Sequence, residues 1–457
     1  MTLSSYSDQL YTRFRLNKMD MFIFETGTIV TLCIFVLTFL LASLYMSAPK
    51  SNLPGPFAFP LVGNLPLLFK EKESEKHLFY QKMAAKYGSV YRLYYGNLMM
   101  VFINGYDAVN SVFVKQADLT TDRPEIMTKR AKVKGIVNQN GPVWKSLRRI
   151  SIQAMRDFGV GKKSLGETVN EEVAVVIKYD HNDRKFQELL DTFDQMFSGE
   201  GTTSLGRILP WFKYIKMKEH KTTYDPNHCR DFIDLYLQLV NDEFKTKPTF
   251  DAEAFAATIL AFFAAGTDTT AQTLNWAMLY MLGFPETQAK CQKEIDKVIG
   301  HGRMVSLDDK DKLVYVQATL MEIQRLSSIA SSSMLRVTTG DVHVDGHVIP
   351  KGTIIRGNII SSLFDSKYWD DPLKFLPERF IGTDGKITKK EGFIPFFTGP
   401  RMCPGEPLAK MELFLVFSNI LQRFNLEKPH PDTQLDFNGF SSVTFRPHPF
   451  QIRAVLR

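Results

Sequence analysis

A single cysteine near the C-terminus has neighbours that favour a thiolate. Small, aromatic and basic residues surround Cys403 at fixed spacing: Phe396, Gly399, Arg401 and Gly405. A long apolar segment with a helical pattern, residues 406–424, follows directly. We therefore expect Cys403 on a tight loop at a helix N-terminus, where free N–H groups and the helix dipole lower the pKa of a thiol. A thiolate there is a metal ligand or a nucleophile, and the glycines let a flat ligand approach closely.

A second candidate site lies within the longest helical pattern, residues 251–282. Gly266 interrupts this pattern at a cost of about 1 kcal/mol, so its presence needs a reason. Ala265 and Gly266 are small enough for a flat cofactor or a diatomic molecule to approach the helix. Asp268 and Thr269 add an acid and an alcohol, a pair that can relay protons from solvent. The alternative is a kinked core helix whose polar residues are solvated.

Two pairs of residues are spaced by about one helical turn, and each pair includes an arginine. Glu322 and Arg325 are three residues apart, and Trp144 and Arg148 are four apart, so the members of each pair share a helix face. On its own, an exposed Glu–Arg pair contributes only a few tenths of a kcal/mol and indicates a solvated face.

Together these patterns resemble the cytochrome P-450 family, the haem-thiolate monooxygenases. F-x-x-G-x-R-x-C-x-G is the family's cysteine signature, and residues 265–270 match A-G-x-D-T-T at every position. W-x-x-x-R, E-x-x-R and P-E-R-F are matched as well. The resemblance covers nearly the whole chain and is nearest to the animal microsomal branch that oxidises drugs and fatty acids. It implies a fold that is mainly α with small β-sheets, preceded by one N-terminal transmembrane helix.

The resemblance also implies roles for individual residues. Cys403 would be the axial ligand of haem b, with Phe396 covering the sulfur. Thr269 and Asp268 would be catalytic, beside Ala265 at the haem. A buried triad would brace the cysteine loop: Glu322, Arg325 and Arg379. The haem propionates would be held by Trp144, Arg148 and Arg401, and also by Arg123 and Arg336, for which ordinary surface arginines are the alternative.

Partners follow from the resemblance and from charge. It implies electrons from NADPH through a membrane-bound flavoprotein reductase, with a cytochrome b-type protein as a further donor. A cationic set could attract such a donor: Lys145, Arg149 and Lys410. The net charge of +7 fits an acidic partner, membrane lipid or solubility alone, and does not single out nucleic acid. Segments that contact substrate in the family are apolar or small here, which implies a lipophilic molecule: Phe262, Phe263, Ala265, 331–335 and 440–443.

Chain organisation suggests an anchored enzyme. Residues 27–46 carry no charge and as a helix would span about 30 Å, the thickness of a bilayer core. We assign residues 1–48 to a tail and membrane anchor, 49–64 to a proline-rich hinge and 65–457 to the haem-thiolate domain. Within this domain we expect a hairpin around residues 95–97 and β-structure over 342–355. The four cysteines are widely spaced, which argues against disulfides or a zinc module.

Charge and the resemblance imply opposite orientations of the anchor. Three basic residues precede the anchor and one closely follows it, so the positive-inside rule alone puts the body in the lumen. The resemblance implies a single-pass protein of the endoplasmic reticulum membrane with a cytosolic catalytic body. An alternative start at Met19 or Met21 would reconcile the two.

The middle of the chain is shorter than the family pattern, between about residues 177 and 218. Either this is a natural minimal form, or it is a truncated product that binds haem poorly and lacks catalysis. A haem-thiolate isomerase or dehydratase that needs no reductase is a further alternative, although Thr269 and Asp268 argue against it.

Overall fold

The computed structural model describes residues 28–42, 52–59, 61–71, 76–129, 135–178, 225, 234, 252–441 and 444–457. The start of the chain, most of the shortened middle and residues 442–443 of the expected substrate contacts lie outside these ranges. The chain divides into two compact units, one made of residues 1–52, 56–69 and 93–99, and one of 53–55, 70–92 and 100–457.

The first unit contains a helix over residues 28–42 with exposed side chains and the short helix α2 (Leu65–Phe69). Asn64 organises the segment before α2, since its Nδ2 donates to Phe57 O at 2.7 Å and its Oδ1 accepts from Tyr94 N at 2.8 Å. Among the residues described, none of the helices combines the length and the apolarity that crossing a membrane requires.

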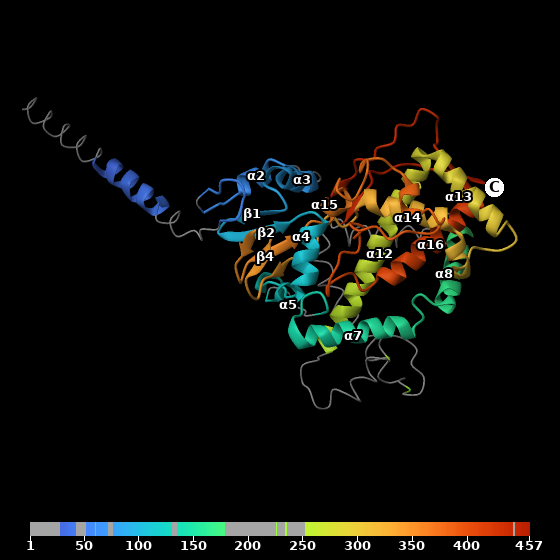
Figure 1. The fold of residues 1–457 in the computed structure, drawn as a ribbon, viewed down its shortest axis with the longest axis horizontal. Helices are drawn as coiled ribbons and strands as arrows, with labels where there is room; N and C mark the ends of the chain where they lie inside the picture. Colours follow the sequence, from blue (N-terminus) through green and yellow to red (C-terminus); the bar gives the residue numbers. More distant parts are fainter. Residues whose placement is uncertain are drawn as a thin grey trace, which may run out of the picture. The chain divides into compact units, whose positions relative to one another are not determined.

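The second unit is built mainly from helices (Figure 1). Its longer helices are α3 (Lys76–Tyr87), α7 (Gly141–Asp157), α8 (Lys163–Lys178), α12 (Ala252–Gly283), α13 (Pro285–Val298), α14 (Val314–Ser327) and α16 (Glu406–Arg423). Short helices connect them: α4 (Tyr106–Asn110), η2 (Ser111–Lys115), α5 (Ala117–Thr120), α6 (Glu125–Thr128), η4 (Leu307–Lys312), α15 (Ile359–Leu363) and η5 (Pro377–Phe380).

The strands form small sheets. The largest has the order β1-β2-β6-β3, and its strands are β1 (Val90–Tyr95), β2 (Leu98–Ile103), β6 (Ile354–Gly357) and β3 (Arg336–Val337). β2 and β6 run parallel. The others are antiparallel pairs: β4 (Val342–Val344) with β5 (His347–Ile349), β7 (Phe424–Glu427) with β10 (Arg453–Leu456), and β8 (Phe440–Ser441) with β9 (Phe445–Arg446). The prediction of a mainly α fold with small sheets is confirmed, including the hairpin around residues 95–97.

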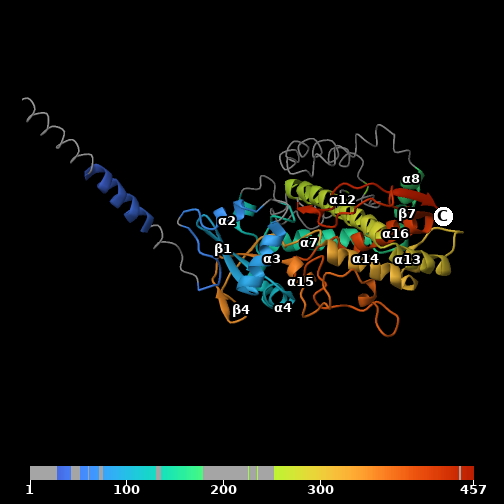
Figure 2. The same cartoon turned by 90° about the horizontal axis from the view of Figure 1, so that it is seen from above.

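One apolar core lies between α12, α13, α14 and α16, which are side by side in both views (Figures 1 and 2). Its fully buried side chains include Trp276, Ile323 and Phe414. The C-terminal part of α12 is buried in this core, from Trp276 to Leu282. α14 begins without a capping residue of its own, and Glu294 of α13 accepts hydrogen bonds from Tyr315 N and Val316 N instead. This carboxylate satisfies the free N–H groups that helices leave at their start.

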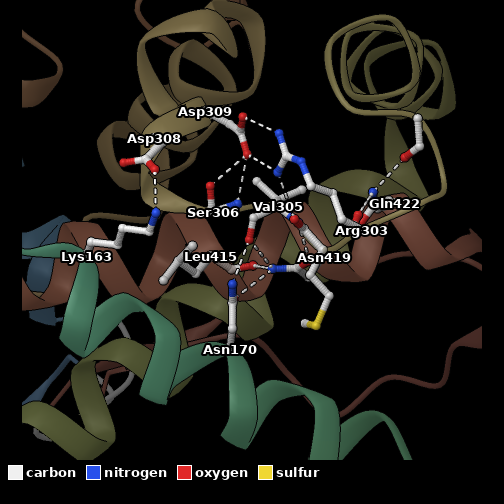
Figure 3. A network of polar contacts seen from close by, with 12 residues as sticks. Lys163, Asn170, Arg303, Val305, Ser306, Asp308, Asp309, Leu415, Asn419 and Gln422 are labelled. Atoms are coloured by element: carbon white, nitrogen blue, oxygen red, sulfur yellow. Dashed lines mark hydrogen bonds and ion pairs between the residues drawn. The ribbon is translucent and has the colours of Figure 1, made fainter.

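A polar network joins α8, the start of η4 and α16 (Figure 3). Asn419 of α16 is its centre: Oδ1 accepts from Val305 N at 2.9 Å, and Nδ2 donates to Leu415 O and to Asn170 Oδ1 of α8. Arg303 forms two bonds to the buried Asp309 carboxylate, of 2.6 and 2.7 Å. The network therefore fixes the part of α16 that lies away from the cysteine loop.

Candidate functional site

The loop before α16 presents Cys403. Its backbone closes on itself, since Cys403 N donates to Phe396 O and Met402 N donates to Gly399 O, both at 3.0 Å. Gly399 has φ +76°, and a Cβ there would lie 2.0 Å from Phe113 O, so both conformation and space require glycine. Gly405 has an ordinary φ of −86° and directly precedes the helix. The loop thus places the thiol before the N-terminus of α16, as expected.

The pKa of this thiol differs from the expectation. Although Cys403 is an exposed residue, desolvation by the surrounding protein raises the pKa of its thiol above the ordinary value. A backbone hydrogen bond from Gly405 and the charge of Arg148 lower this pKa without compensating for the desolvation. The N–H groups at the helix N-terminus lower the pKa as predicted, through Gly405 and Glu406, but desolvation outweighs them and the net shift is upward. A metal cation at the sulfur would supply the stabilisation that the thiolate needs.

Four arginines gather beside the loop: Arg123, Arg148, Arg336 and Arg401. Arg336 is buried, and its Nε and Nη1 have no hydrogen-bond partner among the described residues. Burial lowers the pKa of Arg336 well below its usual range, and the neighbouring arginines lower it further. Arg401 lies over the ring of Trp144 at 3.8 Å, and Arg148 Nη2 donates to Met402 O at 2.8 Å. Buried cations that repel one another call for an anionic ligand.

Asn140 holds two members of this arginine cluster. Its Oδ1 accepts from Arg123 N at 2.7 Å and from Arg401 Nη2 at 3.2 Å, and its Nδ2 donates to Arg123 O. The sequence analysis missed Asn140, and the only available signal was its position directly before the helix that carries Trp144. Its contacts join residues up to 261 positions apart, which spacing along the chain cannot reveal.

Glu322, Arg325 and Arg379 meet in the interior. Arg325 forms two bonds of 2.8 Å to the Glu322 carboxylate, and Arg379 Nε donates to Glu322 Oε1 at 3.0 Å. The Glu322 and Arg325 side chains are fully buried, and that of Arg379 is 7% exposed. Arg325 also donates to the carbonyls of Leu363 and Pro372. The set therefore links α14 to η5 and to the chain before it.

α12 carries the predicted oxygen site as an uninterrupted helix. Ala265 and Gly266 are exposed, and a Cβ on Gly266 would contact no protein atom. Thr269 Oγ1 donates to Ala265 O at 2.7 Å. The structure does not pair Asp268 with Thr269: Asp268 is buried, and its carboxylate accepts from Arg446 Nη2 and Thr444 Oγ1.

The remaining predicted residues are also placed. Phe396 is half-buried beside Lys410, whose Nζ lies 5.6 Å from the ring centroid. Phe262 packs with Trp144, and Phe263 is exposed. Ser331 and Ser332 line a small hollow with Tyr80, Phe102, Asn358 and Ile360.

Comparison with known proteins agrees with this geometry. The family model "Cytochrome P450" matches residues 53–200 and 212–454. The chain belongs to the cytochrome P450 family. Cytochrome P450 2J5 of Mus musculus is 32% identical over 94% of this chain and 96% of its own length. Cytochrome P450 2B4 of Oryctolagus cuniculus is 32% identical over 92% and 97%, and cytochrome P450 2D20 of Mesocricetus auratus is 35% identical over 88% and 93%.

This P450 is therefore a monooxygenase, and its family uses haem iron bound by a cysteine thiolate. The residues present fit that group. Cys403 is an exposed thiol, Arg336 of the arginine cluster offers unsatisfied cationic donors for the haem carboxylates, and α12 offers a surface without side-chain bulk at Gly266. The alignment with cytochrome P450 2J5 runs over 490 positions, more than the 457 residues of this chain, so the relative has residues that this chain lacks.

Proposed function

We propose that this P450 inserts one oxygen atom from dioxygen into a lipophilic small molecule, such as a xenobiotic, fatty acid or steroid-like compound. Electrons would come from NADPH through a flavoprotein reductase. The observation that carries the proposal is the buried guanidinium of Arg336, whose Nε and Nη1 have no hydrogen-bond partner among the described residues, beside three other arginines and the loop of Cys403.

Individual residues would have separate roles at the haem site. Cys403 would bind the iron, while Arg148, Arg336 and Arg401 would hold the carboxylates of the haem. When bound, the haem supplies the activation of dioxygen. Thr269 would present its hydroxyl on the open side of α12, where the neighbouring Ala265 and Gly266 leave room for oxygen. Its hydrogen bond to Ala265 O holds the hydroxyl in place and leaves its lone pairs free to accept a proton.

Three exposed cationic side chains could bind an acidic electron donor. Lys145 and Arg149 are exposed on α7, and Lys410 is exposed on α16. Lys410 Nζ also binds Glu406 at 2.6 Å, one turn before it in the same helix. These helices also carry Trp144 and follow Cys403, so a donor docked there would be close to the thiolate loop. Charge complementarity of this kind raises association rates and weakens with salt.

We also propose that residues 27–46 anchor the protein in the endoplasmic reticulum membrane, with the catalytic body in the cytosol. The absence of charge from this stretch and the resemblance to the microsomal branch support this placement.

One alternative is a catalytically impaired short form, which the extra residues of the relatives favour. The discriminating experiment is the absorption spectrum of the reduced protein with carbon monoxide. We expect the red-shifted Soret band of thiolate-ligated haem, together with product that depends on NADPH and reductase. Cys403→Ser should abolish that band. Absence of haem from the purified wild type would favour the impaired form, and turnover only with peroxides would favour an isomerase or dehydratase.

A further inference from the structure

Two residues near the C-terminus hold the acid of the oxygen site. Asp268 Oδ1 accepts from Arg446 Nη2 at 2.8 Å, and Asp268 Oδ2 accepts from Thr444 Oγ1 at 2.7 Å. The Arg446 side chain is 11% exposed and that of Asp268 is 7% exposed. An ion pair so withdrawn from water is sensitive to the loss of either partner, because the other charge is left buried.

α12 makes a second contact with these strands further along its length. Trp276 is two helical turns after Asp268, and its Nε1 donates to Phe445 O at 3.1 Å. The rings of Trp276 and Phe445 stack at 5.4 Å. A Cβ on Gly439, which has φ +62°, would lie 2.7 Å from the Trp276 ring. The β8–β9 strand pair therefore packs along α12 from Asp268 to Trp276.

Thr269 has a different hydrogen-bond partner from Asp268. Successive helical residues point about 100° apart, so Thr269 is aligned with Ala265 and not with Asp268. The hydroxyl bonds the Ala265 carbonyl, beside the exposed side of the helix. The acid and the alcohol are adjacent in sequence but are bound to different partners.

We propose that Arg446 and Thr444 are positioning residues of the oxygen site, and that Asp268 is their anchor on α12 and not the proton carrier. Each carboxylate oxygen accepts a hydrogen bond, and delivering a proton from Asp268 would require the ion pair to break. The ion pair fixes β8–β9 to the helix one residue before Thr269. Phe440 begins β8 and is paired with Arg446. The proposal rests on the proposed function in one respect, since Thr269 is taken as the residue beside oxygen.

The test uses the full-length, haem-loaded protein with its reductase. Wild type is compared with Arg446→Gln, with Asp268→Asn and with the double variant. Arg446→Lys is the conservative rescue. Arg453→Gln is the matched control, because Arg453 lies on the exposed strand β10 and forms an ion pair with Glu427 there at the surface. Thr444→Val removes the hydroxyl that donates to Asp268 Oδ2 and accepts from Arg446 Nε, keeps the Asp268–Arg446 ion pair, and serves if Arg446→Gln does not fold. The readouts are the thiolate–carbon monoxide band, product formed per NADPH consumed, the solvent isotope effect on turnover, and the dissociation constant of n-octylamine from the Soret shift.

If the ion pair acts as a unit, both single variants weaken n-octylamine binding and lower product per NADPH by about three- to tenfold, and the double variant matches either single one. The solvent isotope effect stays at the wild-type value, Arg446→Lys restores most of the loss, and Arg453→Gln behaves as wild type. The proposal is overturned if Asp268→Asn alone slows turnover and changes the isotope effect while Arg446→Gln does neither. Multiplicative effects in the double variant would overturn it as well.

Failure of the proposed function is recognised separately. A wild-type protein with the thiolate band but without NADPH-dependent product contradicts the monooxygenase. The contact between Asp268 and Arg446 can still be tested without turnover, by the n-octylamine titration and by amide hydrogen exchange at Phe445, whose N–H donates to Ile329 O. Unchanged exchange at Phe445 in both Arg446→Gln and Asp268→Asn would then reject it.

Discussion

At the scale of single residues, charge without a partner is the clearest functional signal in this P450. Arg336 is 2% exposed, with two nitrogens unbonded among the described residues. The rings of Phe113 and Phe397 lie 5.1 and 5.2 Å from its guanidinium carbon. Ring faces attract a cation but cannot replace an anion. Folding the protein therefore places a cation where an anionic ligand is needed, and in the proposed function that ligand is a haem carboxylate.

Arg336→Met should have opposite effects on the two forms of the protein. In the haem-free form it removes a buried charge that three arginines repel, so the free energy of unfolding should rise by about 1–3 kcal/mol. In the loaded form it removes a carboxylate partner, so haem should dissociate about tenfold faster. Urea unfolding of the haem-free protein and haem transfer to apomyoglobin measure the two effects. Arg336→Lys, which keeps the charge, is the control, and a less stable haem-free Met variant would contradict the argument.

At the scale of elements, single carboxylates join segments that are distant in sequence. Glu322 joins α14 to η5 through Arg325 and Arg379, and its Oε1 also accepts from Leu376 N at 3.0 Å. Glu294 joins α13 to the start of α14. Both are glutamates that satisfy donors of other elements, but only Glu322 compensates buried guanidinium charge.

Glu322→Gln should therefore cost much more stability than Glu294→Gln. The first leaves Arg325 buried without a counter-ion, which costs about 3–5 kcal/mol. The second weakens a helix cap, at about 1 kcal/mol. Urea unfolding together with the amplitude of the thiolate–carbon monoxide band checks both. Equal losses in the two variants would mean that the Glu322 set acts as an ordinary cap.

Arg303 and Asp309 supply a pH-dependent contact at the start of η4 (Figure 3). The hydrogen bonds from Arg303 lower the pKa of Asp309 from 3.8 to about 2. A lowered carboxyl pKa adds stability above the unfolded value, and that stability is lost as pH falls through the folded value. Because Arg303 is half exposed, Arg303→Gln should cost about 1 kcal/mol at pH 7. The difference from wild type should hold down to pH 4 and shrink toward pH 2, as measured by urea unfolding across that range. A constant difference over this window would count against the ion pair.

Sequence patterns predicted the elements better than their contacts. Residues 251–282 and 406–424 were expected as helices and are α12 and α16 within one residue at each end, because continuous apolar stretches bounded by Gly and Pro are local signals. The pairing of β2 with β6 and the Asp268–Arg446 ion pair join residues some 180 to 250 positions apart, and no local pattern encodes them. The pKa of Cys403 was predicted in the wrong direction because desolvation depends on the packed surroundings.

At the scale of the whole molecule, the site and the expected anchor are separate in sequence. Each described residue of the arginine cluster, the Glu322 set, α12 and the cysteine loop belongs to residues 100–457, within the second compact unit. The exposed apolar helix over residues 28–42 belongs to the first. Haem binding should therefore not depend on the N-terminal residues.

Deletion of residues 1–48 tests this separation. The shortened chain should keep the thiolate–carbon monoxide band, because each group proposed to hold haem remains. It should also move from the membrane fraction toward the supernatant, because most apolar surface that a bilayer would bury has been removed. Expression with fractionation and alkaline carbonate extraction of the full-length protein measure the second effect, and the same deletion carrying Cys403→Ser is the control for the band. Carbonate extraction of the full-length protein would contradict the anchor, whereas loss of the band on deletion would mean that the N-terminal residues help to build the site.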